Sequence, residues 1–129
     1  MCACIDLNGQ TAAQPSSSLP LSDINCSKHL DTAHYCIIRA DLTLGQQLAQ
    51  SIHAAGESAP QGTIPGTIAI ALHARDEKHL TEIAASLAEA GISHHIIEEC
   101  DGEKMAIGCA PTTDRALMRK VLSRLPLAR

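Results

Sequence analysis

The spacing of apolar residues alternates between strand-like runs and helix-like stripes across residues 34–125. Compact runs of small and β-branched residues predict strands at 34–39, 67–72, 92–99 and 104–109. Stripes with apolar residues every three to four positions predict helices that begin near residues 44, 77 and 114. This β-α-β-α-β-β-α order implies parallel strands joined by helices, followed by an antiparallel hairpin. We therefore expect an α/β fold of three layers, α/β/α, with a four-stranded mixed sheet.

Local signals refine three of these elements. The run 67–72 is apolar throughout, which is typical of a strand that is buried on both faces. Asp76 and Gly91 are the expected N-cap and C′ residues of the second helix. The last helix is expected to start at a cap formed by Thr112 or Thr113.

The chain of 129 residues is long enough for one domain, which we place at residues 34–129. Residues 1–33 are rich in Ser, Pro, Gln, Asn and Asp without periodicity, and we expect a poorly ordered leader. Tyr35 is the only aromatic residue, so the core must be built from aliphatic side chains. The leader lacks the basic start and apolar segment of a secretory signal, and no run is long enough to span a membrane, which predicts a cytoplasmic protein.

The six cysteines show no repeated spacing, and we interpret them as reduced thiols. Two clusters, Cys2-x-Cys4 and His94-His95, lack the spacing of a metal site, because neighbours on a strand point to opposite faces. We therefore expect no metal and no cofactor. The net charge of −4 argues against a protein that simply coats nucleic acid, although it allows a local basic patch.

The most informative motif lies between the first strand and the first helix. It consists of Arg39-Ala40-Asp41-Leu42, then Gly45, then Ala49-Gln50-Ser51-Ile52-His53-Ala54-Ala55. Together with the order of elements over roughly residues 34–127, this pattern resembles the type II peptidyl-tRNA hydrolase family. The resemblance implies a hydrolase of translation that cleaves the ester bond between a peptide and tRNA without a cofactor.

Two departures bring the chain closer to the divergent branch of peptidyl-tRNA hydrolase-domain proteins. Gln46 stands where the family has a Lys after the Gly. A short acidic segment, residues 98–103, replaces a longer loop that carries a carboxylate and hydroxyls in the family. The alternative function is therefore a non-catalytic member of the same fold that binds RNA or a protein partner.

Ester hydrolysis needs an activated water and a stabilised oxyanion. His53 is a candidate general base, Asp41 a candidate for orienting a neighbour, and Glu99 or Asp101 a replacement for the family's carboxylate. Gln50 lies on the helix face of His53 and, with Gln46, is a candidate for substrate binding. We expect these residues to meet where the first strand ends, the first helix starts and the hairpin turns. The structural alternatives are that Asp41 caps the helix, that Gln50 bonds a backbone group and that His53 packs against the sheet.

A basic face on the last helix is the second candidate binding feature. Arg115 and Arg119, with Lys120 and Arg124, lie opposite the apolar stripe of this helix. They predict either a phosphate-binding surface or an ordinary solvated helix face. The expected partner is tRNA or peptidyl-tRNA, no membrane is expected, and a homodimer is left open.

Overall fold

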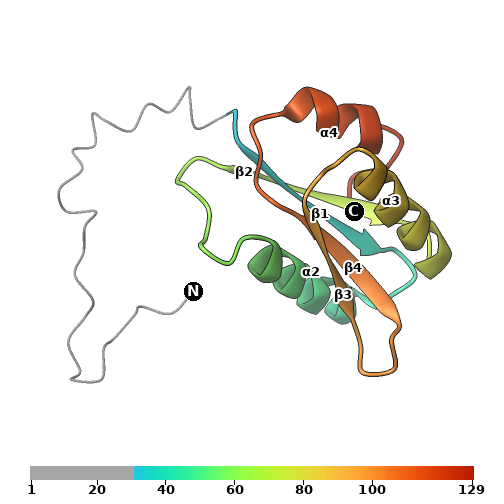
Figure 1. Ribbon diagram of the computed structural model, residues 1–129. Coiled ribbons are helices and arrows are strands. Elements are labelled where there is room, and N and C mark those ends of the chain that lie inside the picture. Colours follow the sequence, from blue (N-terminus) through green and yellow to red (C-terminus); the bar gives the residue numbers. More distant parts are fainter. Residues whose placement is uncertain (1–30) are drawn as a thin grey trace, which may run out of the picture.

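The computed structural model describes residues 31–129, which form a four-stranded sheet between helices (Figure 1). The elements are β1 (Ala33–Arg39), α2 (Leu44–Ser58), β2 (Ile68–Ala74), α3 (Glu77–Glu89), β3 (His94–Glu98), β4 (Lys104–Cys109) and α4 (Arg115–Leu122). The expected order β-α-β-α-β-β-α is confirmed. Strand β1 begins one residue before its expected start, and residues 1–30 of the expected leader lie outside the described residues.

The sheet is mixed, as expected, with the strand order β2-β1-β4-β3. Strands β1 and β2 are parallel, whereas β4 runs antiparallel to both β1 and β3. The β3–β4 hairpin closes through a hydrogen bond from the Glu99 amide to the Glu103 carbonyl, and Gly102 turns the chain with a φ of 85°. Because β2 and β3 occupy opposite edges, α3 connects strands that do not pair.

The expectation that the run 67–72 is buried on both faces is wrong. Strand β2 is an edge strand; Ala69 and Ala71 are exposed and Ile70 is only half-buried. The physical reason is that α2 packs mainly on β1, β4 and β3 and reaches β2 at His73, which leaves Ala69 and Ala71 uncovered. Residues 126–128 run along the outer edge of β2, where the His73 amide donates to the Pro126 carbonyl at 2.9 Å.

The capping residues predicted from the sequence are confirmed for α3 and wrong for α4. Asp76 caps α3 by accepting a hydrogen bond from the His79 amide at 2.8 Å, and Gly91 adopts the left-handed conformation just after the helix. The N-cap of α4 is Asp114 instead of Thr112 or Thr113. Thr112 accepts a hydrogen bond from the Asp114 amide at 3.0 Å, so it supports the cap from outside the helix.

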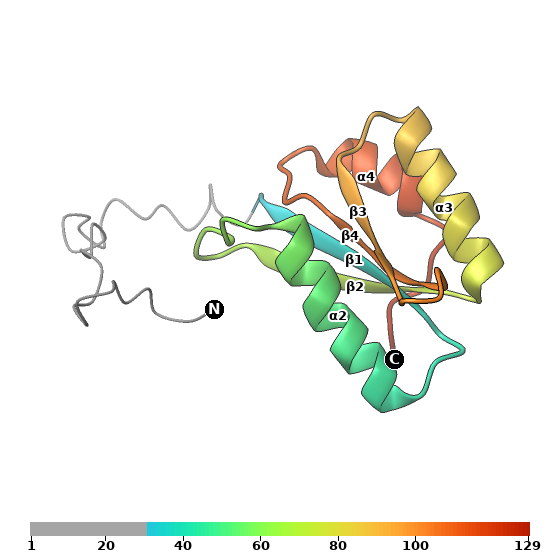
Figure 2. The ribbon, with the colours of Figure 1, turned by 60° about the horizontal axis from the view of Figure 1, so that its bottom comes forward.

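The two faces of the sheet carry unequal cores. Helices α3 and α4 cover one face, and α2 alone covers the other (Figure 2). The larger core, under α3 and α4, contains Tyr35, Ile37, Leu80, Ile83, Leu87, Ile107, Met118 and Leu122. The smaller core, under α2, contains only five buried apolar residues: Cys36, Ile38, Ala54, Ile97 and Ala106. No helix within residues 31–129 is both long and apolar enough to cross a membrane.

Helix α2 contacts the sheet through polar side chains, which we call its polar underside: Gln47, Gln50 and Ser58. Ser58 Oγ lies 2.8 Å from His34 Nε2 of β1, and Gln47 Oε1 lies 2.7 Å from His73 Nε2 of β2. The large apolar residues of the same helix, Leu44, Leu48 and Ile52, are exposed. This is the reverse of an ordinary surface helix, in which the apolar stripe faces the core.

A close approach between helix and sheet explains the polar underside. Gly108 of β4 lies directly beneath α2, and a Cβ added there would fall against the Ala54 carbonyl and within 2.5 Å of Ser58 Oγ. There is no space at this point for large apolar side chains between the two backbones. Short polar groups and Ala54, which is fully buried, fill the contact instead.

We predict that Gly108→Ala destabilises the protein by about 1–3 kcal/mol, because the added methyl group forces α2 away from β4. The matched control is Gly56→Ala, since a Cβ at this helical position meets nothing within 4 Å. The control should leave the free energy of unfolding unchanged or raise it by up to about 1 kcal/mol. Urea denaturation measures both changes, and equal effects of the two variants would contradict the close approach.

His34 predicts a pH dependence of stability. Ser58 Oγ donates its hydrogen to the Ala54 carbonyl at 2.6 Å, so it accepts the hydrogen of His34 Nε2. Burial lowers the pKa of His34 below the ordinary 6.5. Just below pH 6.5, His34 is therefore protonated in the unfolded chain but not in the folded one. Stability is therefore lost as the pH falls below 6.5.

His34→Gln keeps a donor for Ser58 and removes this titration. We expect its free energy of unfolding to fall less than that of the wild type between about pH 7 and pH 5. Parallel slopes for the two proteins in urea melts over this range would show that His34 is not the group responsible.

Candidate functional site

The candidate site lies where β1 ends, α2 begins and the β3–β4 hairpin turns. Strand β4 is the antiparallel neighbour of β1, so the turn that precedes β4 comes to lie beside the end of β1. A surface hollow of about 380 Å³ opens here, lined by Gln46, Glu99, Cys100, Asp101, Glu103 and Met105. The sheet topology therefore brings together residues that are more than 50 positions apart in the sequence.

Arg39, the last residue of β1, is the centre of an ion-pair cluster with Asp41 and Glu103. Its guanidinium donates to both oxygens of Asp41, at 2.9 and 2.8 Å, and to Glu103 Oε1 at 2.6 Å. It also donates to the Lys104 carbonyl at 3.0 Å. The Arg39 side chain is only 9% exposed, so the cluster joins β1 to the hairpin from the inside.

This cluster determines what Asp41 can do. The hydrogen bonds from Arg39 hold the pKa of Asp41 below its ordinary value, and both of its oxygens are engaged. Asp41 is therefore a poor proton acceptor, and the neighbour that it orients is Arg39. The alternative that Asp41 caps the helix is wrong, because the N-cap is Thr43, which forms a capping box with Gln46.

Gln50 and Glu99 form the second contact of the site. Gln50 Nε2 donates a hydrogen bond to Glu99 Oε1 at 3.0 Å, and Gln50 is only 7% exposed. The carboxylate requires a donor, which fixes the orientation of the amide. Gln50 Oε1 is buried and has no donor within residues 31–129. A buried acceptor without a partner costs free energy, and such a group is often retained for a functional reason.

Gln46 contributes an amide donor to the wall of the hollow. Its Oε1 accepts hydrogen bonds from the Thr43 amide and hydroxyl, at 3.0 and 3.1 Å. These two bonds fix the side chain in the first turn of α2. Its Nε2 donates to no group in the described part of the chain, so it is free to bind a substrate oxygen.

Asp101 and His53 are both exposed at the surface. Asp101 accepts a hydrogen bond from the Glu103 amide at 2.9 Å, which shapes the hairpin turn. His53 follows Gln50 by about one helical turn and has no hydrogen-bond partner among residues 31–129. It is exposed, so the alternative that it packs against the sheet is wrong. Helix α2 covers the face on which Gln50 reaches Glu99, so His53 and Glu99 are not separated by the sheet.

The two arginines expected to bind substrate are not part of this site. Arg115 and Arg119 lie on α4, which packs on the face of the sheet opposite α2. They line a separate hollow of about 560 Å³ together with Asp31, Thr113 and Asp114. The structure therefore brings Gln46, Gln50, Glu99 and Asp101 together and leaves this arginine pair apart from them.

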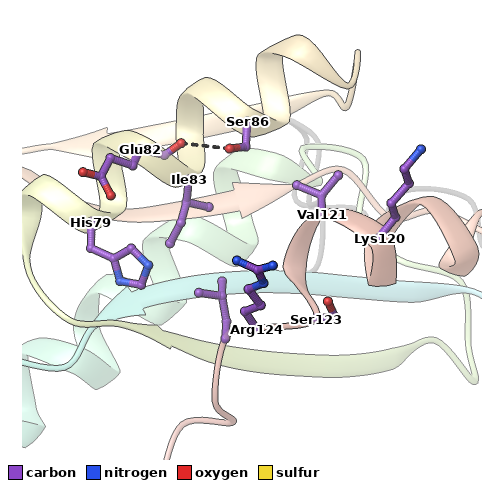
Figure 3. Close-up of a pocket in the computed structure, with 9 residues that line it drawn as sticks. His79, Glu82, Ile83, Ser86, Lys120, Val121, Ser123 and Arg124 are labelled. Atoms are coloured by element: carbon purple, nitrogen blue, oxygen red, sulfur yellow. Dashed lines mark hydrogen bonds between the residues drawn. The ribbon is translucent and has the colours of Figure 1, made fainter.

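The other basic residues of the last helical region line a third hollow. Lys120 and Arg124 face His79, Glu82 and Ser86 in a space of about 370 Å³ between α3 and α4 (Figure 3). Ser86 Oγ donates a hydrogen bond to the Glu82 carbonyl, and His79 Nδ1 accepts a hydrogen bond from the Arg75 amide. The basic face expected on the last helix is thus divided between two hollows.

Sequence reasoning did not identify Arg39 and Glu103 as site residues. Their contact joins positions 64 apart, which no local pattern reveals. The available signal was the i, i+2 spacing of Arg39 and Asp41, which places both side chains on one face of an extended segment.

Two other findings bear on the chemistry of the described part of the chain. Among residues 31–129, no group of three His, Cys, Asp or Glu side chains is close enough to hold a metal ion. The buried thiols of Cys36 and Cys109 are free, and burial raises their pKa values to about 11 and about 12. Both therefore remain protonated at neutral pH and are unsuited to act as nucleophiles.

No protein-family model matches the chain, and no curated protein is similar enough to count as a relative. The chemistry of the site must therefore be argued from its own geometry.

We predict that Arg39→Met destabilises the protein by about 1–3 kcal/mol at neutral pH, because Asp41 and Glu103 lose their common donor. Both carboxylates are 41% exposed, so water replaces part of the interaction. The low pKa of Asp41 stabilises the wild type above pH 3.8, and this contribution is lost as the pH falls through the pKa of the folded state. The stability difference between wild type and variant should therefore narrow below pH 3.8. A difference that stays constant in urea melts down to about pH 3 would contradict this.

Proposed function

We propose that this protein is a peptidyl-tRNA hydrolase that cleaves the ester bond between peptide and tRNA in the cytoplasm. The observation that carries the proposal is the contact between Gln50 and Glu99 beside the hollow. Gln50 Nε2 holds the Glu99 carboxylate at 3.0 Å, and Glu99 lines the hollow. A carboxylate held in a fixed position at a surface hollow is what a hydrolase needs to deprotonate water.

In this mechanism, water in the hollow donates a hydrogen bond to the Glu99 carboxylate, which Gln50 Nε2 holds in place. The water oxygen attacks the ester carbonyl carbon while Glu99 takes the proton. The bond between this carbon and the ribose oxygen then breaks, and the leaving oxygen receives the proton from Glu99. The products are tRNA with a free hydroxyl and a peptide carboxylic acid, which releases its proton to solvent, so the reaction consumes only water.

Two other residues support this chemistry. Gln46 Nε2 donates to the oxyanion that forms at the ester carbonyl, because its own Oε1 is held by Thr43. His53 is the alternative base, since it lies one helical turn from Gln50. The rim of the hollow is acidic, so the tRNA phosphates bind away from it, and Arg115 and Arg119 are the proposed contacts.

We predict that Glu99→Gln lowers the rate of peptide release from a labelled peptidyl-tRNA by about 10²–10⁴-fold. The variant keeps an acceptor for Gln50 Nε2 and removes only the base, so its thermal midpoint should hardly change. The matched control is Glu98→Gln, a half-exposed neighbour paired at 3.9 Å with Lys104, which should keep wild-type activity.

His53→Ala separates the two candidate bases in the same assay. If His53→Ala loses turnover and Glu99→Gln retains it, the base is His53. No release above background by the wild type would eliminate the hydrolase proposal.

A second candidate function is a non-catalytic protein of the same fold that binds RNA or a protein partner. The observation in its favour is the Arg39 cluster, which engages Asp41 and Glu103 and leaves fewer free groups for chemistry. A wild type that binds peptidyl-tRNA in a filter assay without releasing peptide would support this alternative.

A further inference from the structure

The outward face of α2 is free of Asp, Glu, Lys and Arg and largely apolar from Leu44 to Gly56. Leu44, Leu48 and Ile52 are 73%, 59% and 74% exposed, and we call them the apolar stripe. The helix contains no Asp, Glu, Lys or Arg before Glu57. Contiguous exposed apolar surface on a protein of this size generally marks an interaction site.

Small residues lie beside the apolar stripe, and we call them its groove. Gly45, Ala49 and Gly56 are exposed at helical spacing on the same outward face. A glycine inside a helix costs about 1 kcal/mol relative to alanine. A Cβ at Gly45 or Gly56 would meet nothing within 4 Å in the described part of the chain, so packing within residues 31–129 does not require either glycine. Close approach by the backbone of another helix provides a reason for Gly45.

We propose that α2 pairs with α2 of a second copy of this chain, antiparallel across a two-fold axis centred between Leu48 and Ala49. In this register each large residue lies opposite a small one: Ile52 faces Gly45 of the second copy, and Leu48 faces Ala49. The same surface serves both partners, as the two-fold symmetry of a homodimer demands. The antiparallel arrangement also opposes the two helix dipoles.

The chemistry of the apolar stripe favours a second copy of α2 over RNA as its binding partner. An RNA backbone requires cations, and the stripe and its groove have none. A second uncharged helix loses no ionic hydration when it binds. A helix of 15 residues is about 22 Å long, so the pair buries less area than a standard interface, and a dissociation constant in the micromolar range is expected. The proposal is independent of the hydrolase mechanism.

Sedimentation velocity of the full chain across the micromolar range tests the dimer. We expect Ile52→Lys to raise the dissociation constant at least tenfold, because it places a charge in the centre of an apolar contact. The control is Leu127→Lys, at another exposed apolar residue. Leu127 pairs with Leu72, whose side chain faces α3 and α4, so its side chain points away from α2. A wild type that stays monomeric, or a dimer that Ile52→Lys leaves intact, would overturn the proposal.

A mixture of two variants tests the antiparallel register. Gly45→Glu alone should also weaken the homodimer, and it is compatible with the first turn of a helix. Mixed one to one, Ile52→Lys and Gly45→Glu should form a heterodimer, because the two introduced charges face each other. Native mass spectrometry distinguishes the heterodimer by mass, and circular dichroism checks that both variants fold. Failure of the mixture to associate more tightly than either variant alone would overturn the antiparallel pairing.

Discussion

The structure depends on the close contact between α2 and β4 at Gly108. This contact leaves no room for bulky side chains, so the helix is held by hydrogen bonds from its polar underside to groups on or beside three different strands. The bonds of Ser58 and Gln50 satisfy side chains that are buried beneath the helix. The arrangement fixes the position of α2 more specifically than an apolar interface does, because hydrogen bonds tolerate little displacement.

The candidate site follows from the same arrangement. Gln50 belongs to the polar underside, yet only its Nε2 is used to bond the hairpin at Glu99. Its Oε1 therefore remains as a buried acceptor at the position where α2 meets the hairpin. On the opposite side of the hairpin, Arg39 ties Glu103 to the end of β1. The turn is thus held from two directions, which fixes the position of the carboxylates at the candidate site.

The sequence predicted the order of elements because strand runs, stripes and caps such as Asp76 and Gly91 are local signals. It did not predict which face of α2 packs, because the stripe of Leu44, Leu48 and Ile52 has the same period whether it faces the core or solvent. It predicted that Gln50 and Glu99 come together at the strand–helix–hairpin junction, since chain order constrains that meeting point, and their side chains lie 3.0 Å apart there. It missed Arg39 and Glu103, since their pairing depends on the strand register between β1 and β4.

The strand order has a consequence for synthesis. Strand β4 fills the gap between β1 and β3, although it is the last of the four strands to be made. Until residues 104–109 leave the ribosome, the edge of β1 that pairs with β4 is unpaired and exposes aliphatic residues. Helix α2 also lacks its packing contact with Gly108. The sheet therefore cannot be completed before this late segment of six residues is synthesised. During that interval the exposed strand edge makes the nascent chain prone to aggregation and a target for chaperones.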